Sequence, residues 1–498
     1  MTAEHVSPLR DPTSDQILDG IIQRRQDWGQ PLSSHRVDIS LPILLHSDES
    51  PLPCRETVEE LDTVDDHFSL QIRGLFNALV TCQGRDAAAG DEHSLCLRSE
   101  GLFVELKIQL QLISHTPSCQ HRAYVSNRLT LKDPNALPQV SCVTKLLLRS
   151  VPNYGDLVGF TNVRPISLRV PLELLTRLPA IQELECPWLW ERMPIAFPAE
   201  PMRHYTRPWE GPWRDARHEF GRAALELDQS MPASLRRARL WFWETGCPQE
   251  DQSMQMPDLV HPAEVDPVSI GLRSFASHFE ELDLRAFLMP QFFDAQTPWP
   301  RMKRLRVEFH PWRPDGSWYF VGPQGEDPNF LGFKIQDEHY PPKIATDEDN
   351  KMDTKHADFF EECYEEDERW QDMFRTEPSA DRIEPLLATF AKPLKTVVSL
   401  EEAELFTWLS WFPSGERQSN YEDDAPYEEG VHRWGLKYTA AKGASKAWVE
   451  WQIGDWRPQP NILELFEALG GDNGVEITWK AFEFMEHREQ DLTAYIYA

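Results

Sequence analysis

The residues best suited to chemistry in this sequence are isolated histidines, an aspartate-rich segment and scattered cysteines. His310 and His339 each lie in a loop-like stretch without a second ligand at helical spacing, which favours solvent-facing or hydrogen-bonded histidines over metal ligands. Segment 347–353, DEDNKMD, is acidic like a calcium loop but lacks the Gly at position six and the Glu at position twelve. Cys142 and Cys363 have no adjacent His or Lys that would favour a thiolate. We therefore expect neither a metal site nor a cofactor.

Sequence motifs for nucleotide, serine or zinc chemistry are absent. The chain contains no GxxxxGK[ST], no GxGxxG after a strand, no GxSxG, no HExxH and no CxxC pair. The tryptophan-rich pieces at 188–193 and 241–244 favour packing over a ligand cage. A non-catalytic protein is the favoured interpretation. The alternative is an enzyme of unrecognised type with a cleft beside one of the long insertions described below.

The charge balance limits the classes of partner. The chain has 81 acidic and 50 basic residues, a formal net charge of −31, so its field repels nucleic acids and anionic membrane surfaces. No run of 18 apolar residues predicts a membrane span, and the first residues lack the layout of a secretion signal. Eight cysteines without paired spacing are typical of reduced thiols. These features predict a cytoplasmic or nuclear protein.

A recurring apolar pattern predicts the elements of the fold. It consists of an apolar residue, two variable residues, Leu or Ala, one variable residue and a second apolar residue, which resembles the strand signature of leucine-rich repeats. The six matches are Val143–Leu146–Leu148, Ile181–Leu184–Cys186, Leu235–Ala238–Leu240, Phe279–Leu282–Leu284, Met302–Leu305–Val307 and Leu400–Ala403–Leu405. Their spacing runs from 23 residues (279 to 302) to 98 residues (302 to 400), whereas regular arrays repeat every ~20–29 residues.

Helix-like segments precede several of these matches. They are 171–178, 219–227, 268–279 and 383–391, and each leads into a strand match within about a dozen residues. Stacked helix–strand units in one order favour a mainly parallel sheet. We therefore expect an α/β fold, an irregular leucine-rich-repeat-like solenoid of helix–strand units with a mainly parallel sheet and long insertions.

The same pattern predicts a candidate binding surface. Side chains alternate between the two faces of a strand, so the variable positions between and after the apolar ones should share one exposed face. These residues are Glu185, Arg239, Trp241, Asp283, Arg285, Arg306, Glu308, Glu404 and Phe406. Charged and aromatic residues alternating across an open sheet predict a surface on which another protein docks.

Composition shifts suggest the domain boundaries. Residues 1–34 form a partly disordered segment with one short helix, and 35–430 form the repeat-like domain. Two insertions interrupt this domain at 186–212 and 311–374, the second with an acidic run. Residues 431–498 supply further strands and a helix that pack on the same array.

Several segments, in the same order, resemble a large group of filamentous-fungal F-box proteins. They are HRVDISLPILLHSDESPLPCRET (35–57), GLFNAL (74–79), LPQVSCVTKLLLR (137–149), LLTRLPAIQELE (174–185), SIGLRSFASHFEELDLR (269–285), WPRMKRLRVEFHPWRPDGSWYFVG (299–322) and EPLLATFAKPLKTVVSLEEAELFTWL (384–409). The resemblance covers most of residues 35–410.

This resemblance implies a substrate-receptor role. Such proteins dock on the Skp adaptor of a cullin–RING ubiquitin ligase through an N-terminal F-box and hold a target with their repeat region. The 34 residues before His35 have room for one helix and contain no Leu-Pro-x-Glu stretch, so we expect the F-box to be absent or truncated. The predicted function is a protein-binding scaffold for an unknown protein target, with the Skp adaptor as a partner only if an F-box is present.

Overall fold

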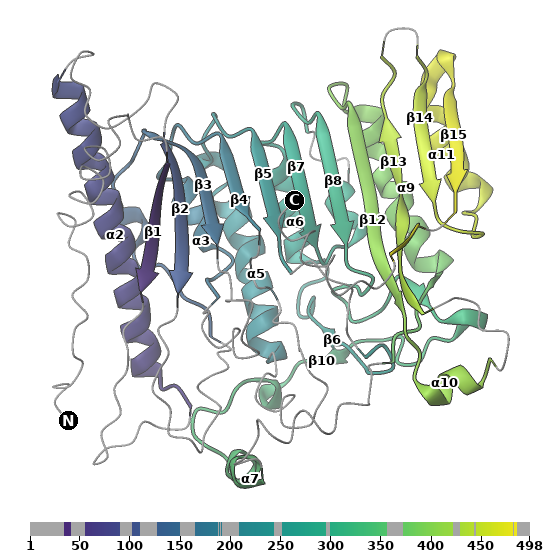
Figure 1. The fold of residues 1–498 in the computed structure, drawn as a ribbon, viewed down its shortest axis with the longest axis horizontal. Helices are drawn as coiled ribbons and strands as arrows, with labels where there is room; N and C mark the ends of the chain where they lie inside the picture. The colour runs from purple at the N-terminus through teal and green to yellow at the C-terminus, as the bar shows by residue number, and fades with distance from the viewer. Residues whose placement is uncertain are drawn as a thin grey trace.

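A large twelve-stranded sheet with helices along one face dominates the chain (Figure 1). The computed structural model describes residues 34–40, 55–89, 102–109, 127–149, 165–187, 189, 191, 209–243, 251–294, 299–355, 372–421, 429–442, 445–481 and 483–485. The helix predicted within 1–34 and most of the acidic run after residue 355 lie outside these described residues.

The sheet begins with eight parallel strands in chain order. They are β1 (Ser34–Ser40), β2 (Leu102–Gln109), β3 (Val143–Arg149), β4 (Glu183–Cys186), β5 (Arg237–Trp241), β7 (Glu281–Ala286), β8 (Arg304–Phe309) and β12 (Glu402–Trp411). Four more strands follow: β13 (Gly430–Thr439), β14 (Ala447–Gln452), β15 (Val475–Lys480) and β16 (Glu483–Met485). β13 is antiparallel to β12, β14 and β16, whereas β15 is parallel to β14. The prediction of a mainly parallel sheet is confirmed.

The described helices lie behind this sheet in the view of Figure 1, and none of them covers its front face, which we call the open face. The main ones are α3 (Val170–Leu175), α5 (Glu210–Glu226), α6 (Pro267–Ala276), α9 (Ala380–Thr396) and α11 (Pro460–Glu467), with α2 (Val58–Ala89) beside β1. Shorter helices are α7 (Asp347–Lys355), α10 (Gly415–Ser419) and the 3-10 turns η1 (Pro134–Ala136), η3 (Asp228–Ser230), η4 (Pro290–Phe293), η5 (Pro323–Gly325), η6 (Asp337–His339) and η7 (Ala468–Asn473). None of the described helices combines the length and apolar composition that a membrane span requires.

Two small sheets lie apart from the large one. β6 (Pro257–Asp258) pairs in parallel with β10 (Phe333–Lys334), and β9 (Phe320–Val321) pairs antiparallel with β11 (Glu377–Pro378). The strand predicted for Trp318–Val321 is therefore confirmed only in its last two residues. All four strands belong to the long segments between the strands of the large sheet.

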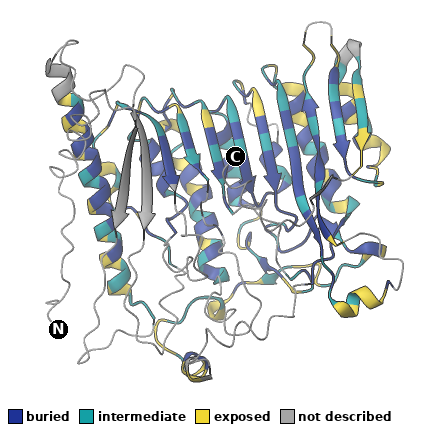
Figure 2. Cartoon of the chain, viewed as in Figure 1, coloured by how far each residue is buried: buried dark blue, intermediate teal, exposed yellow. Residues whose placement is uncertain are grey.

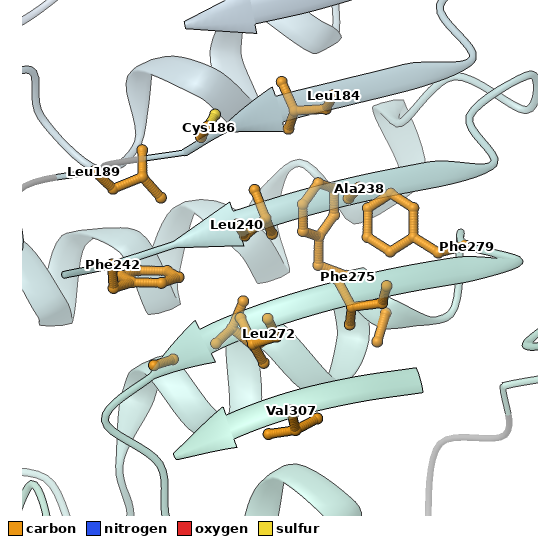
Figure 3. Close-up of a cluster of buried hydrophobic side chains, with 14 of the residues drawn as sticks. Leu184, Cys186, Leu189, Ala238, Leu240, Phe242, Leu272, Phe275, Phe279 and Val307 are labelled. Atoms are coloured by element: carbon orange, nitrogen blue, oxygen red, sulfur yellow. The ribbon is translucent and has the colours of Figure 1, made fainter. Parts of the chain in front are cut away.

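The six apolar matches lie side by side in the sheet. Their middle residues are in register across six strands, in the order Leu146, Leu184, Ala238, Leu282, Leu305 and Ala403. The flanking apolar residues of each match are also buried, and together they form one core with the helices (Figure 3). Because parallel strands carry side chains of one parity on one face, a constant register aligns the apolar residues despite the uneven spacing along the chain.

Glycines allow two of the helices to approach closely. A Cβ atom on Gly221 of α5 would lie 2.4 Å from the carbonyl oxygen of Pro267, and one on Gly271 of α6 would lie 3.0 Å from the Cα atom of Gly221. The α6 helix begins where the Asp266 side chain accepts a hydrogen bond from the Ser269 amide. α5 starts at Glu210, nine residues before its predicted start, because Trp213 and Ala216 add apolar residues to the same buried face.

Candidate binding surface on the open face of the sheet

The open face of the sheet carries the non-core residues of β3 to β13. In Figure 2 the strands from β5 to β12 alternate between buried segments and half-buried or exposed ones. This alternation follows from strand geometry, since successive side chains point to opposite faces. The residues opposite the core are mostly charged, and they form two rows that cross the strands.

The first charged row lies near the start of the strands. In strand order from β3 to β12 it consists of Lys145, Glu183, Arg237, Glu281, Arg304 and Glu402. Charges alternate in sign from each strand to the next. Nζ of Lys145 lies 2.7 Å from one carboxylate oxygen of Glu183, and Nη2 of Arg237 lies 2.9 Å from the other. Each interior charge in this row therefore stands between two opposite charges.

The second charged row lies two residues further along each strand. From β4 to β13 it consists of Glu185, Arg239, Asp283, Arg306, Glu404 and Lys437. Nη1 of Arg306 lies 3.0 Å from Oδ1 of Asp283, and its Nε lies 3.4 Å from Glu404. Nε of Arg239 lies 3.5 Å from the other oxygen of Asp283. We call these two rows together the charged face.

A third row, beside the second one, consists of Trp241, Arg285, Glu308 and Phe406, and all of these except the half-buried Trp241 are buried. Arg285 and Glu308 form an ion pair of 2.9 Å with side chains only 5% and 4% exposed. The Arg285 guanidinium also lies 4.2 Å from the ring centre of Trp241. Phe406 is covered by the guanidinium groups of Arg306 and Arg433, at 4.5 and 4.1 Å from its ring centre.

The sequence-predicted surface residues thus share one face but differ in exposure. Glu185, Arg239, Trp241, Asp283, Arg306 and Glu404 are half-buried and reach solvent. The expected exposure of Arg285, Glu308 and Phe406 is wrong, because these three residues are buried. Their burial follows from mutual ion pairing and cation–π stacking on this face, which alternation alone does not reveal.

A shallow groove of about 430 Å³ runs over the charged face. Its lining includes six acidic side chains (Glu183, Glu185, Glu281, Asp283, Glu402 and Glu404) and five basic ones (Arg237, Arg239, Arg304, Arg306 and Lys437). This groove lies on the strands themselves and not beside the long insertions, where the enzyme alternative places a cleft. Its almost balanced charge contrasts with the net −31 of the whole chain.

Ion pairing stabilises the charged forms of Glu183 and Lys145 in the first row. Burial on its own would raise the pKa of Glu183, but hydrogen bonds that involve Lys145, Glu185 and Arg237 outweigh it and lower this pKa to about 2. Burial would lower the pKa of Lys145, yet its hydrogen bonds to Glu183 and Glu185 raise it. The carboxylate and the ammonium group therefore stabilise each other in their charged forms.

The residues first considered for chemistry have structural partners. Nδ1 of His310 accepts a hydrogen bond from the Trp312 amide at 3.1 Å, and the buried His310 ring stacks on Phe287. Nδ1 of His339 accepts one from the Gln336 amide at 2.9 Å. Both histidines are thus hydrogen-bonded, as the sequence indicated.

The acidic segment 347–353 lies in helix α7, where the Asp349 carboxylate accepts hydrogen bonds from Arg55 and from the Thr346 amide. In the described part of the chain, no group of three or more His, Cys, Asp or Glu residues is arranged to hold a metal ion. Local structure therefore accounts for the Asp349 carboxylate of this segment.

Sequence reasoning missed the first charged row. Its members Glu183, Arg237, Glu281, Arg304 and Glu402 each lie two residues before a predicted surface residue. Extending the alternation upstream by one step would have identified them. Lys437 and Arg433 were missed for a different reason, since β13 runs antiparallel and carries no match to the repeat pattern.

Comparisons with known proteins identify no relative of this chain. No protein-family model matches the chain, no curated protein is similar to it, and no solved structure matches it. The resemblance to fungal F-box proteins stays a prediction that rests on the sequence segments quoted above.

Proposed function

We propose that this chain is a non-catalytic protein-binding scaffold that captures a target protein on its charged face. The observation that carries the proposal is an open sheet face on which two rows of alternating charges, with half-buried or exposed side chains, line a shallow groove. We further propose that the parallel strands and their helices form an irregular leucine-rich-repeat-like solenoid. Folds of this type use the exposed sheet as an extended binding surface.

The charges of this face define the chemistry of the partner. The groove offers nearly equal numbers of carboxylates and basic groups. It therefore does not attract a polyanion strongly, and it can pair with a protein surface that carries charges of both signs. Docking removes water from ion pairs that already satisfy each other, and this desolvation is offset only where the partner returns opposite charges. The partner we propose is a folded protein surface or helix that carries both Lys or Arg and Asp or Glu.

The resemblance to fungal F-box proteins supplies a cellular setting. We propose target capture for ubiquitination if an F-box is encoded upstream of this sequence. An in-frame upstream exon that encodes an F-box, together with recovery of the Skp adaptor by the extended chain, would support this setting. Target capture by the charged face does not depend on that outcome.

Affinity capture with charge variants tests the binding surface. Asp283 pairs with both Arg239 and Arg306, so Asp283→Arg places three guanidinium groups together at the centre of the face. We expect recovery of the partner to fall at least about tenfold, since like charges at an interface are strongly unfavourable. Arg222→Glu, on the exposed side of helix α5, is the matched control and should recover as much partner as the wild type.

The readout is quantitative mass spectrometry of proteins cross-linked to the tagged full chain. A protein that depends on Asp283 and not on Arg222 supports the proposal. The proposal fails if wild type and Asp283→Arg recover the same proteins in equal amounts, or if neither enriches any protein over an untagged control.

A further inference from the structure

The two edges of the large sheet differ in what lies beside them. At the first end, helix α2 lies alongside β1 (Figure 1). At the other end β15 is the outermost described strand, and it pairs with β14 alone among the described residues. A strand in this position can accept another strand through its outer backbone groups.

The core is also incomplete at the β15 end. Val449 and Trp451 of β14 are fully buried, whereas Ile477 is only partly buried and Trp479 is 37% exposed. Leu465 of helix α11, which lies on the same end, is 41% exposed. Inner strands gain their burial from a neighbour on each side, whereas β15 has a neighbour on one side only among the described residues.

The β15 sequence is complementary to itself in one arrangement. We propose that β15 is the contact strand of a two-fold dimer of this chain, in which two copies of β15 pair antiparallel about Thr478. This register places Glu476 opposite Lys480 of the second copy, and Ile477 opposite Trp479. Both pairs occur twice, and the two Thr478 residues face each other. Opposite-charge, aromatic–β-branched and Thr–Thr pairs are the cross-strand pairs that stabilise antiparallel sheets.

The charges also select against other arrangements. A parallel in-register pairing would place Glu476 opposite Glu476 and Lys480 opposite Lys480, which is unfavourable. A shift of the antiparallel register by two residues would leave both charges without their partners. Charged residues on an edge strand normally prevent pairing with other chains, but here their order favours a single two-fold pairing.

Lys480 can pair with a carboxylate of its own chain and with one of the second copy at the same time. Its Nζ lies 2.7 Å from Glu450 of β14, yet the Lys480 side chain is 57% exposed. An ammonium group has three donors, so it can bind Glu450 and Glu476 of the second copy together. Residues that stand opposite each other in two paired strands point to the same face of the sheet. The charged faces of both copies therefore lie on the same side of one continuous sheet.

Exchange of the charges tests the dimer. The oligomeric state of the full chain is measured by sedimentation velocity over a concentration series. We expect the wild type to dimerise, and Glu476→Lys or Lys480→Glu to weaken the dimer by about tenfold or more, because both ion pairs become repulsive. A mixture of the two single variants should recover the dimer, since one copy then offers two lysines and the other two glutamates. Glu464→Lys, on the exposed side of α11, is the matched control and should leave the dimer unchanged.

A cysteine variant tests the register. Cα atoms of directly opposite residues lie about 4.5–5.5 Å apart, so Thr478→Cys should form a disulfide between two copies under mild oxidation. Glu476→Cys is the control, because in the proposed register its two copies are offset by four residues, or roughly 13 Å. Cross-linking of Thr478→Cys well above the wild-type background, without cross-linking of Glu476→Cys, supports the proposal.

Three results would overturn it. The first is a wild-type chain that remains monomeric over the whole concentration series. The second is a dimer that responds neither to Glu476→Lys nor to Lys480→Glu. The third is a monomer that becomes a dimer when the chain is shortened to end at residue 485, since the covering strand would then come from the last residues of the same chain.

Discussion

The two faces of the strands from β3 to β12 place different demands on the side chains, although both depend on the same strand register. On the covered face, the aligned residues need only be apolar, and Ala238 or Ala403 takes the place of Leu without interrupting the row. On the open face, each charge has to meet the opposite charge on the next strand. A slip of one residue would exchange the two faces, so the covered face determines the register and the open face depends on it.

This comparison indicates where the stability of the fold resides. Buried apolar side chains supply most of the folding free energy, while exposed ion pairs contribute little each. Residues of the charged face can therefore be substituted at little cost in stability, provided that neighbouring strands change together. The third row is the exception, because its charged residues, Arg285 and Glu308, are buried.

Breaking the buried pair of the third row should have the largest effect. Glu308→Ala leaves the Arg285 guanidinium buried without its counter-ion, and we expect a loss of about 3–5 kcal/mol in the free energy of unfolding, measured by urea denaturation. Replacing both partners, Arg285→Met with Glu308→Met, should recover at least half of this loss because no buried charge remains. A loss below about 1 kcal/mol for Glu308→Ala would show that this pair behaves like the exposed rows.

Two adjacent residues of β7 compare the faces directly. Leu284 is fully buried on the covered face, so Leu284→Ala should lower the free energy of unfolding by about 2–5 kcal/mol. Asp283 on the open face is the matched neighbour, and Asp283→Ala should cost no more than about 1 kcal/mol. Equal losses for the two variants in the same urea titration would contradict the separation of stability from the charged face.

Acid pH should weaken the open face by a smaller amount. The pKa of Glu183 is lowered from its ordinary value to about 2, so its stabilising contribution is complete above about pH 4.5 and is lost as the pH falls towards 2. Glu183→Gln should thus cost on the order of 1 kcal/mol at pH 7, because solvent screens an ion pair whose basic partners are partly exposed. The difference from wild type should shrink steadily below pH 4.5. A difference that stays constant from pH 7 to pH 2.5 would exclude this ion pair as its cause, and Glu464→Gln on α11 provides the exposed control.

The sequence predicted the strands better than their surroundings. Each match to the repeat pattern became a strand of the sheet because strict alternation of apolar residues is a local signal that tertiary contacts reinforce. The early start of α5 was missed, since Trp213 and Ala216 lie between the predicted insertion at 186–212 and the predicted helix at 219–227 and were assigned to neither. The residues predicted for the candidate surface share one face of the sheet, as expected from their alternation, although three of them are buried.

The burial of Arg285, Glu308 and Phe406 could not be predicted in the same way. It depends on which residues of neighbouring strands stand opposite one another, and that register is a property of the whole sheet. Arg433, which covers Phe406, comes from an antiparallel strand that the repeat pattern does not contain.

The strand order also has a consequence for synthesis on the ribosome. Each strand from β2 to β15 pairs with the strand made just before it in the large sheet, so the sheet can grow in the order of translation. The longest delay comes after β8, because β12 begins at Glu402, 93 positions after Phe309. At ordinary elongation rates this delay lasts roughly 5 to 20 seconds. During this time β8 is a bare edge on the nascent chain, and Arg304, Arg306 and Glu308 are the kind of residues that keep such an edge from pairing with a neighbouring polypeptide.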